Sequence, residues 1–228
     1  MIDDLGQNLE TAKQFMALPM PLTFAVLPHQ RHSREIAELA RSQHHEVILH
    51  LPMEPHGYPG VNSGEGTLLL SMSRDELLKN VRSALDSTPG VSGVNNHMGS
   101  RFTENAGSMK IVLAELKTRG LYFIDSGTSP TSSARSAAHE VGIAFRKRDF
   151  FLDHNPSENA VRLQLKRLIR NARIEGTALG IGHPYGSTYR VLRGAVKQFK
   201  QEQIAVVSAR ELVASGAYAA HRNQFQSQ

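Results

Sequence analysis

The chain has 228 residues, a formal net charge of +5 and no cysteine. The lack of cysteine excludes disulfides, thiolate metal sites and a cysteine nucleophile. No apolar run approaches the ~20 residues that a membrane-spanning helix needs. The densest basic clusters, residues 146–148 and 162–173, contain no interleaved aromatic residues. We therefore expect solvated helix faces there and no nucleic-acid partner.

Short apolar runs alternate with amphipathic stretches along the chain. The predicted strands are residues 1–5, 22–27, 46–51, 93–97, 121–125, 142–145, 178–183 and 204–207. The predicted helices are residues 8–18, 32–43, 73–86, 104–119, 157–174 and 187–200. Strands separated by helices indicate βαβ units and a parallel sheet, and seven or eight such units fit an α/β barrel better than an open sheet. We expect one domain over residues 1–216 and a polar tail over residues 217–228.

Polar side chains gather at the ends of these predicted strands. They are Asp3, Asp4, His50, Asn95, Asn96, His97, Asp125 and His183. In a barrel of parallel strands the carboxyl ends meet at one rim, which carries the active site. The sequence therefore predicts a site built at this rim from several strands.

The adjacent carboxylates Asp3 and Asp4 repel each other, so they favour a nearby cation or proton. One of the two carboxylates would then act as a base and the other as a metal ligand. A carboxylate with the two imidazoles of His50 and His97 is a common ligand set for zinc. Glu54, four residues after His50, would supply another ligand or a substrate contact. The competing interpretation of Asp4 is a helix cap.

His183 suits proton donation to a leaving group, because the pKa of an imidazole lies near neutrality. Either Asp125 or Asp153 would orient an imidazole ring. Asp153 precedes a predicted helix, so helix capping explains it equally well.

Six sequence blocks, in this order, resemble the divergent polysaccharide deacetylases, which are relatives of the NodB-type carbohydrate esterases. The blocks are IDDLG, HEVILHLPMEP, GVNNHMGSRFT, FIDSGTS, FFLDHNPS and LGIGHPYGST. The resemblance implies a distorted (β/α) barrel and a metal-dependent removal of acetyl groups from a polysaccharide or cell-wall glycan. It also suggests a periplasmic or cell-envelope location.

The resemblance assigns roles to individual residues. Asp3 matches the catalytic base, Asp4 a metal ligand, and His183 the general acid. His50 matches the first histidine of a His-x-x-x-His pair, but the second position is Glu54, so His97 is the expected substitute ligand. The full expectation is catalysis by Asp3, His183 and Asp125, a divalent metal, Zn²⁺ above others, on Asp4, His50 and His97, and substrate contacts from Glu54, Asn95, Asn96 and Asp153.

Two other functions fit the same residues. One is an inactive relative that binds a glycan or a protein partner, and the other is a metal-dependent amidase with a different substrate. The first predicted strand raises a related question, because only Met1 and Ile2 precede the Asp pair. Such a short strand is expected to hold the pair loosely, and loose positioning is costly in catalysis.

Overall fold

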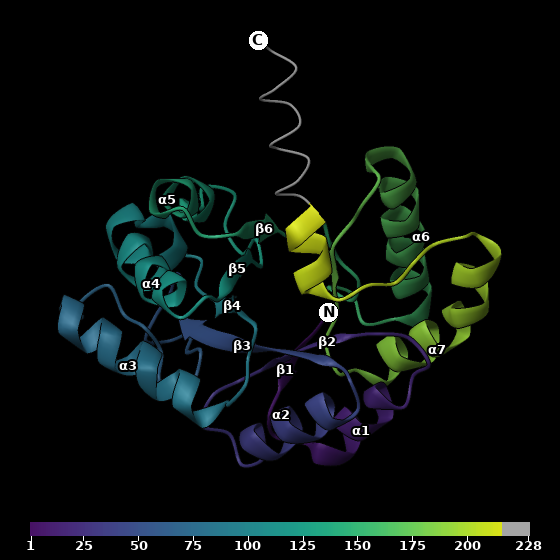
Figure 1. The fold of residues 1–228 in the computed structure, drawn as a ribbon, viewed down its shortest axis with the longest axis horizontal. Helices are drawn as coiled ribbons and strands as arrows, with labels where there is room; N and C mark the ends of the chain where they lie inside the picture. Colours follow the sequence, from purple (N-terminus) through teal and green to yellow (C-terminus); the bar gives the residue numbers. More distant parts are fainter. Residues whose placement is uncertain (216–228) are drawn as a thin grey trace, which may run out of the picture.

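A computed structural model describes residues 1–215 of the chain. The strands are β1 (Ile2–Leu5), β2 (Thr23–Val26), β3 (Glu46–Met53), β4 (Gly93–Met98), β5 (Tyr122–Asp125), β6 (Phe145–Lys147), β7 (Phe150–Phe151) and β8 (Gly180–Ile181). The helices are α1 (Leu9–Met16), α2 (Ser33–Ser42), α3 (Arg74–Ser87), the 3₁₀ helix η1 (Phe102–Glu104), α4 (Ala106–Thr118), α5 (Ala134–Val141), α6 (Glu158–Glu175) and α7 (Gly186–Gln201). Residues 209–215 form a further short helix (Figure 1). Within residues 1–215, no helix is long and apolar enough to cross a membrane.

The strands form a parallel sheet that closes on itself. Strands β1 to β6 pair in chain order, and β7 pairs with β8. A bridge between Ile2 and Gly182 joins the β8 end to β1. Strand β6 pairs with β5, and β7 pairs with β8. Only Arg148 and Asp149 separate β6 from β7, so this short segment of the chain closes the ring. The predicted fold class, a distorted (β/α) barrel, is confirmed.

Alternate residues along the strands point to different cores, as the two-residue period of a strand requires. Phe24, Val47 and Phe123 belong to the clusters that the surrounding helices cover. Their neighbours Ala25 and Ile48 belong to a separate cluster with side chains of β5 and of residues 209–213. This second cluster fills the inside of the barrel below the strand ends.

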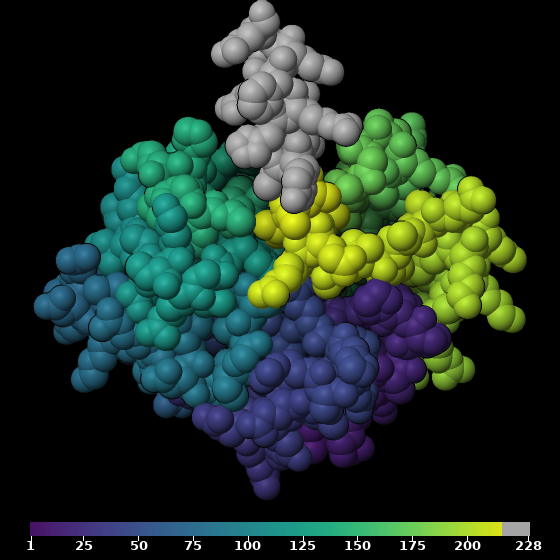
Figure 2. Space-filling view, viewed as in Figure 1, coloured from purple at the N-terminus to yellow at the C-terminus, as the bar shows by residue number. Residues whose placement is uncertain are grey.

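The helix over residues 209–215 covers the amino-terminal end of the barrel (Figure 2). The carboxylate of Glu46, at the start of β3, holds it in place. This carboxylate accepts hydrogen bonds from the Thr23 hydroxyl (2.8 Å), the Tyr122 hydroxyl (2.9 Å) and the Arg210 backbone N–H (3.1 Å). Because the free N–H groups at a helix start attract negative charge, the carboxylate stabilises both the strands and the helix.

The first strand is held on both of its edges. The Asp3 N–H donates to the Gly182 carbonyl (2.9 Å), and the Leu27 N–H donates to the Leu5 carbonyl (2.7 Å). The Asp3 side chain is buried. The expectation of a loosely held Asp pair is therefore wrong.

The sequence misplaced elements in the second half of the chain. Residues 204–207 form no strand: they link α7 to the helix at 209, and the Ile204 N–H donates back to the Phe199 carbonyl in α7. The strand predicted at residues 142–145 is instead Phe145–Lys147, since Gly142 ends α5 in a left-handed conformation (φ 73°). Helix α5 and strand β7 were not predicted. Gly216 and the predicted tail 217–228 lie outside the residues that the structure describes.

We predict that Glu46→Ala lowers the free energy of unfolding by about 2–3 kcal/mol, because it leaves the hydroxyl and N–H donors around it without an acceptor. Urea unfolding measures this loss. The control is Glu10→Ala, which removes an exposed ion pair with Lys13 and is expected to change stability by less than about 0.5 kcal/mol. Equal effects of the two substitutions would contradict the role of Glu46.

Candidate metal centre

The register of the parallel strands brings the predicted rim residues together. His50 on β3 lies beside Asn95 on β4, and Pro52 lies beside His97. Strand β1 contributes Asp3 and Asp4. Asp4 has a positive φ of 57°, an unusual backbone conformation for a residue other than glycine. At this irregular position of β1, the carboxylates of Asp3 and Asp4 both lie near His50.

Asp4, His50 and His97 form a compact group of possible metal ligands. Asp4 Oδ1 lies 3.1 Å from His50 Nε2 and 2.9 Å from His97 Nδ1. The two imidazole nitrogens are 3.1 Å apart. Ligands placed tetrahedrally about 2.0–2.2 Å from a zinc ion would be about 3.4 Å apart. The three side chains therefore need only small shifts to hold a divalent cation, and their donor set fits one.

Asn95 fixes the orientation of His50. Its buried side-chain oxygen accepts a hydrogen bond from His50 Nδ1 at 2.8 Å. Because Asn95 holds the proton on Nδ1, a loss of the second proton would leave the lone pair on Nε2, which faces Asp4 and His97 and is the form that a metal ligand requires. The Asn95 amide also donates to Asp3 Oδ2 at 2.9 Å. Asn95 was predicted to contact substrate, which stays a prediction; in the structure its side chain hydrogen-bonds to both Asp3 and His50.

Asp3 lies next to the ligand group, and one of its two side-chain oxygens has no hydrogen-bond partner. Its Oδ2 lies 3.6 Å from His50 Nε2. Its Oδ1 is the one buried side-chain polar atom in residues 1–215 that has no hydrogen-bond partner. Such an atom costs free energy unless water or a ligand reaches it. Burial raises the pKa of Asp3, against the opposing effects of His50 and His183.

The pKa of Asp4 is lowered, whereas the pKa of His50 is raised. Burial alone would raise the pKa of Asp4, but hydrogen bonds from His50 and His97 hold it well below its usual value. Burial alone would lower the pKa of His50, but the carboxylates of Asp3 and Asp4 raise it to about 9. The pair thus carries opposite charges at neutral pH, and a bound cation would replace the proton on the histidine.

His183 approaches the same group from β8. Its Nε2 lies 3.9 Å from Asp4 Oδ2. Its Nδ1 is 2.8 Å from Asp153 Oδ1, and its backbone N–H donates to Asp153 Oδ2. Burial lowers the pKa of His183, but the hydrogen bond and charge of Asp153 raise it overall. Asp153 was predicted to contact substrate or to orient an imidazole, and the structure places it in the second role.

Thr188, on α7, was not among the predicted residues. Its hydroxyl donates to Asp153 Oδ2 at 2.6 Å and fixes the carboxylate that orients His183. Thr188 is completely buried. A single threonine on a helix carries no sequence signal that distinguishes this position.

Glu54, a predicted substrate contact, lies apart from the group of possible metal ligands. Its carboxylate accepts a hydrogen bond from the Leu70 N–H at 2.6 Å and pairs with Arg101 at 2.7 Å. The residue is 4% exposed. One oxygen therefore binds the loop between β3 and α3, and the other binds Arg101 in the segment after β4. The sequence offered Glu54 and His97 as alternatives for the third ligand, and His97 is the one that lies in the ligand group.

Asn96 and Asp125 also hold backbone rather than the metal group. The Asn96 side chain accepts from the Ser126 N–H and donates to the Met98 carbonyl, both at 2.8 Å. It is completely buried in this structure, and its predicted substrate contact stays a prediction. Asp125 accepts from the Gly127 N–H at 2.8 Å, within its own turn, and its predicted catalytic role stays a prediction.

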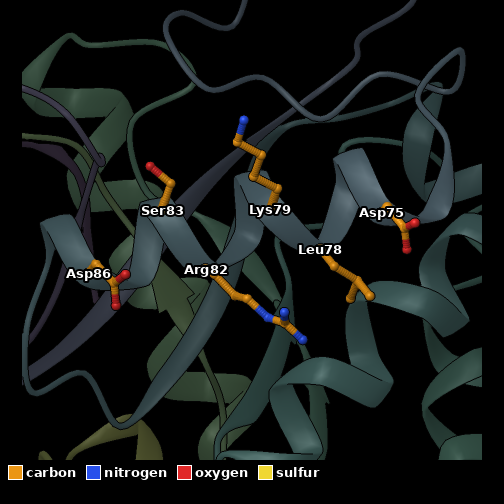
Figure 3. Close-up of a pocket in the computed structure, with 6 residues that line it drawn as sticks. All are labelled: Asp75, Leu78, Lys79, Arg82, Ser83 and Asp86. Atoms are coloured by element: carbon orange, nitrogen blue, oxygen red, sulfur yellow. The ribbon is translucent and has the colours of Figure 1, made fainter.

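A hollow on the outer face of α3 is unrelated to this site. It is lined by six side chains of that one helix: Asp75, Leu78, Lys79, Arg82, Ser83 and Asp86 (Figure 3). These are mixed charges on a solvated helix face. The rim of the barrel, rather than this hollow, carries the convergent titratable groups.

Comparison with known proteins agrees with this geometry. Residues 1–213 match the family described as divergent polysaccharide deacetylase. The chain belongs to this family. It is 38% identical over 213 residues to the uncharacterized protein YibQ of Escherichia coli K12, covering 93% of this chain and 66% of YibQ. An uncharacterized protein of Haemophilus influenzae is 32% identical over 202 residues, covering 89% of this chain and 71% of that protein. The chain thus spans slightly less than two thirds of YibQ.

Solved structures extend the relationship. The uncharacterized protein ATU2773 of Agrobacterium tumefaciens C58 superposes with a TM-score of 0.89 at 25% identity, covering 92% of this chain and 86% of that one. BA3943 of Bacillus anthracis, a CE4 family pseudoenzyme, superposes with a TM-score of 0.52 at 13% identity, covering 93% and 65%. A BA3943 mutant with restored enzymatic activity gives a TM-score of 0.54 at 15% identity, covering 93% and 65%. The divergent deacetylase fold is therefore related to that of the CE4, or NodB-type, esterases.

We predict that the protein binds about one Zn²⁺ per chain, and that His97→Ala weakens binding by more than about 100-fold, since removal of a ligand costs at least as much as removal of its supporting partner. Glu54→Gln is the matched control and is expected to keep the affinity. Calorimetric titration of metal-free protein with zinc measures both. Loss of binding in Glu54→Gln with retention in His97→Ala would reverse the ligand assignment.

Proposed function

We propose that this divergent deacetylase is a metal-dependent hydrolase that removes acetyl groups from a polysaccharide or cell-wall glycan. One observation carries the proposal: a buried carboxylate with a free oxygen, Asp3, and an Asp-oriented imidazole, His183, flank the same ligand group. A base, an acid and a cation site within one rim are what hydrolysis of an amide or ester requires.

Asp4, His50 and His97 would hold the cation, and Zn²⁺ is the ion that this ligand set favours. When bound, a divalent ion would polarise the acetyl carbonyl and lower the pKa of water. Asn95 supports this role by keeping the proton of His50 on Nδ1, away from the ligand group.

The two flanking groups supply the proton transfers. Asp3 Oδ1 accepts a proton from the attacking water while the water oxygen bonds to the acetyl carbon. His183 then donates the proton on Nε2 to the departing nitrogen or oxygen of the sugar, and the bond between this atom and the acetyl carbon breaks. The products are acetate and a glycan with a free amine or hydroxyl. Asp153 keeps Nδ1 protonated, so Nε2 is the atom that donates and recovers the proton.

Acetate release tests the proposal. We expect zinc-loaded protein to release acetate from N-acetylated or O-acetylated oligosaccharides, and Asp3→Asn to reduce kcat by about 10²–10⁴-fold, the usual contribution of a general base. Glu10→Gln, on the exposed face of α1, is the matched control and is expected to keep full activity. Equal rates in wild type and Asp3→Asn would exclude the proposed chemistry, and zinc-loaded wild type without any acetate release would exclude the hydrolase.

The pH profile tests the Asp153–His183 pair. His183 must be protonated to act as the acid, so activity falls as the pH rises through its pKa. Asp153 raises that pKa, so Asp153→Asn is expected to move the alkaline limb of the kcat profile to lower pH and to reduce kcat at the optimum. An alkaline limb at the same pH in both proteins would show that Asp153 does not act through His183.

A further inference from the structure

His183 belongs to a row of four planar side chains beside the ligand group. The Arg148 guanidinium lies 3.6 Å from the centre of the Phe151 ring. Phe151 and His183 have ring centres 5.7 Å apart at an angle of 31°. His183 and Tyr185 also lie 5.7 Å apart, at an angle of 36°. The four side chains therefore follow one another as direct neighbours, with the proposed acid between Phe151 and Tyr185.

The two ends of this row differ in access. Arg148 covers Phe151 and is held there by hydrogen bonds to the carbonyls of Ser126 (2.6 Å) and Gly127 (3.1 Å). Tyr185 is 47% exposed. It directly precedes α7, but its side chain does not cap that helix. Its backbone N–H donates to the His183 carbonyl at 2.7 Å, which fixes the ring beside the imidazole.

The product that keeps the leaving atom is the one that must lie next to His183. In deacetylation the leaving atom stays on the glycan, and the acetyl group departs with the water oxygen. The proton donor must therefore face the glycan. Since Tyr185 adjoins the donor and offers an open ring, a glycan bound for reaction would extend along this side of the site.

We propose that the exposed ring of Tyr185 is a sugar-binding subsite, which stacks against the pyranose neighbouring the acetylated unit. A pyranose ring carries an apolar C–H face and a polar rim, which suits an aromatic ring that is apolar on its face and polar at its tip. This inference rests on the proposed function for its substrate class. It makes Tyr185 a determinant of specificity for chains over single acetylated sugars.

The test compares Tyr185→Ala and Tyr185→Phe with wild type on two substrates. One is the tetramer of N-acetylglucosamine, and the other is 4-nitrophenyl acetate, which has no glycan. We expect Tyr185→Ala to raise the KM for the tetramer about tenfold relative to the KM for 4-nitrophenyl acetate, the loss typical of one anchoring aromatic ring. Tyr185→Phe keeps the stacking face and is expected to restore the ratio. Ile174→Ala, an exposed apolar residue on α6, is the matched control.

A purely structural role for Tyr185 would change both substrates equally, and that result would overturn the subsite. A second measurement separates this outcome from failure of the hydrolase itself. Calorimetry reports binding of the tetramer without turnover. Weaker binding to Tyr185→Ala than to wild type would support the subsite even if no acetate were released. Equal binding to both proteins, or no binding to wild type, would overturn it.

Discussion

The buried amide of Asn95 hydrogen-bonds at once to His50 and to Asp3, and the rim is arranged around these two contacts. The amide offers an acceptor to the imidazole and a donor to the carboxylate, so it keeps a proton on Nδ1 of His50. Inside a protein such a satisfied network is rigid, because breaking any member leaves a buried polar group unpaired. Asn95 therefore couples the position of Asp3 to the position of His50.

Fold alone does not decide whether this protein turns over substrate. BA3943 is described as a pseudoenzyme, and a mutant of it has restored enzymatic activity, although both share this fold. The fold that this chain shares with them is therefore compatible with both states. In the present chain Asp3, Asp4 and His183 all reach one centre, and their supporting partners Asn95 and Asp153 are buried and hydrogen-bonded to them.

The sequence predicted the barrel and the strand-end residues, because buried parallel strands and the residues that follow them leave strong local patterns. The local pattern did not show which other residues the polar side chains would contact in the folded protein. Asn95, Asn96 and Glu54 were expected at the substrate, yet all three are buried and hold neighbouring groups. Their partners lie on other strands or loops, and a local pattern does not show which of two polar neighbours turns inward. Helix α5 was missed because serine and threonine surround its start.

Strand β1 sits between β2 and residues near 182, so the barrel joins the first residues of the chain to some of its last. Contacts this distant in sequence form late and slow folding. During synthesis on the ribosome, the carboxylate of Asp3 has no enclosing ring until residues 180–182 have left the exit tunnel. The order of translation would therefore leave Asp3 without these contacts until the ring around it can close.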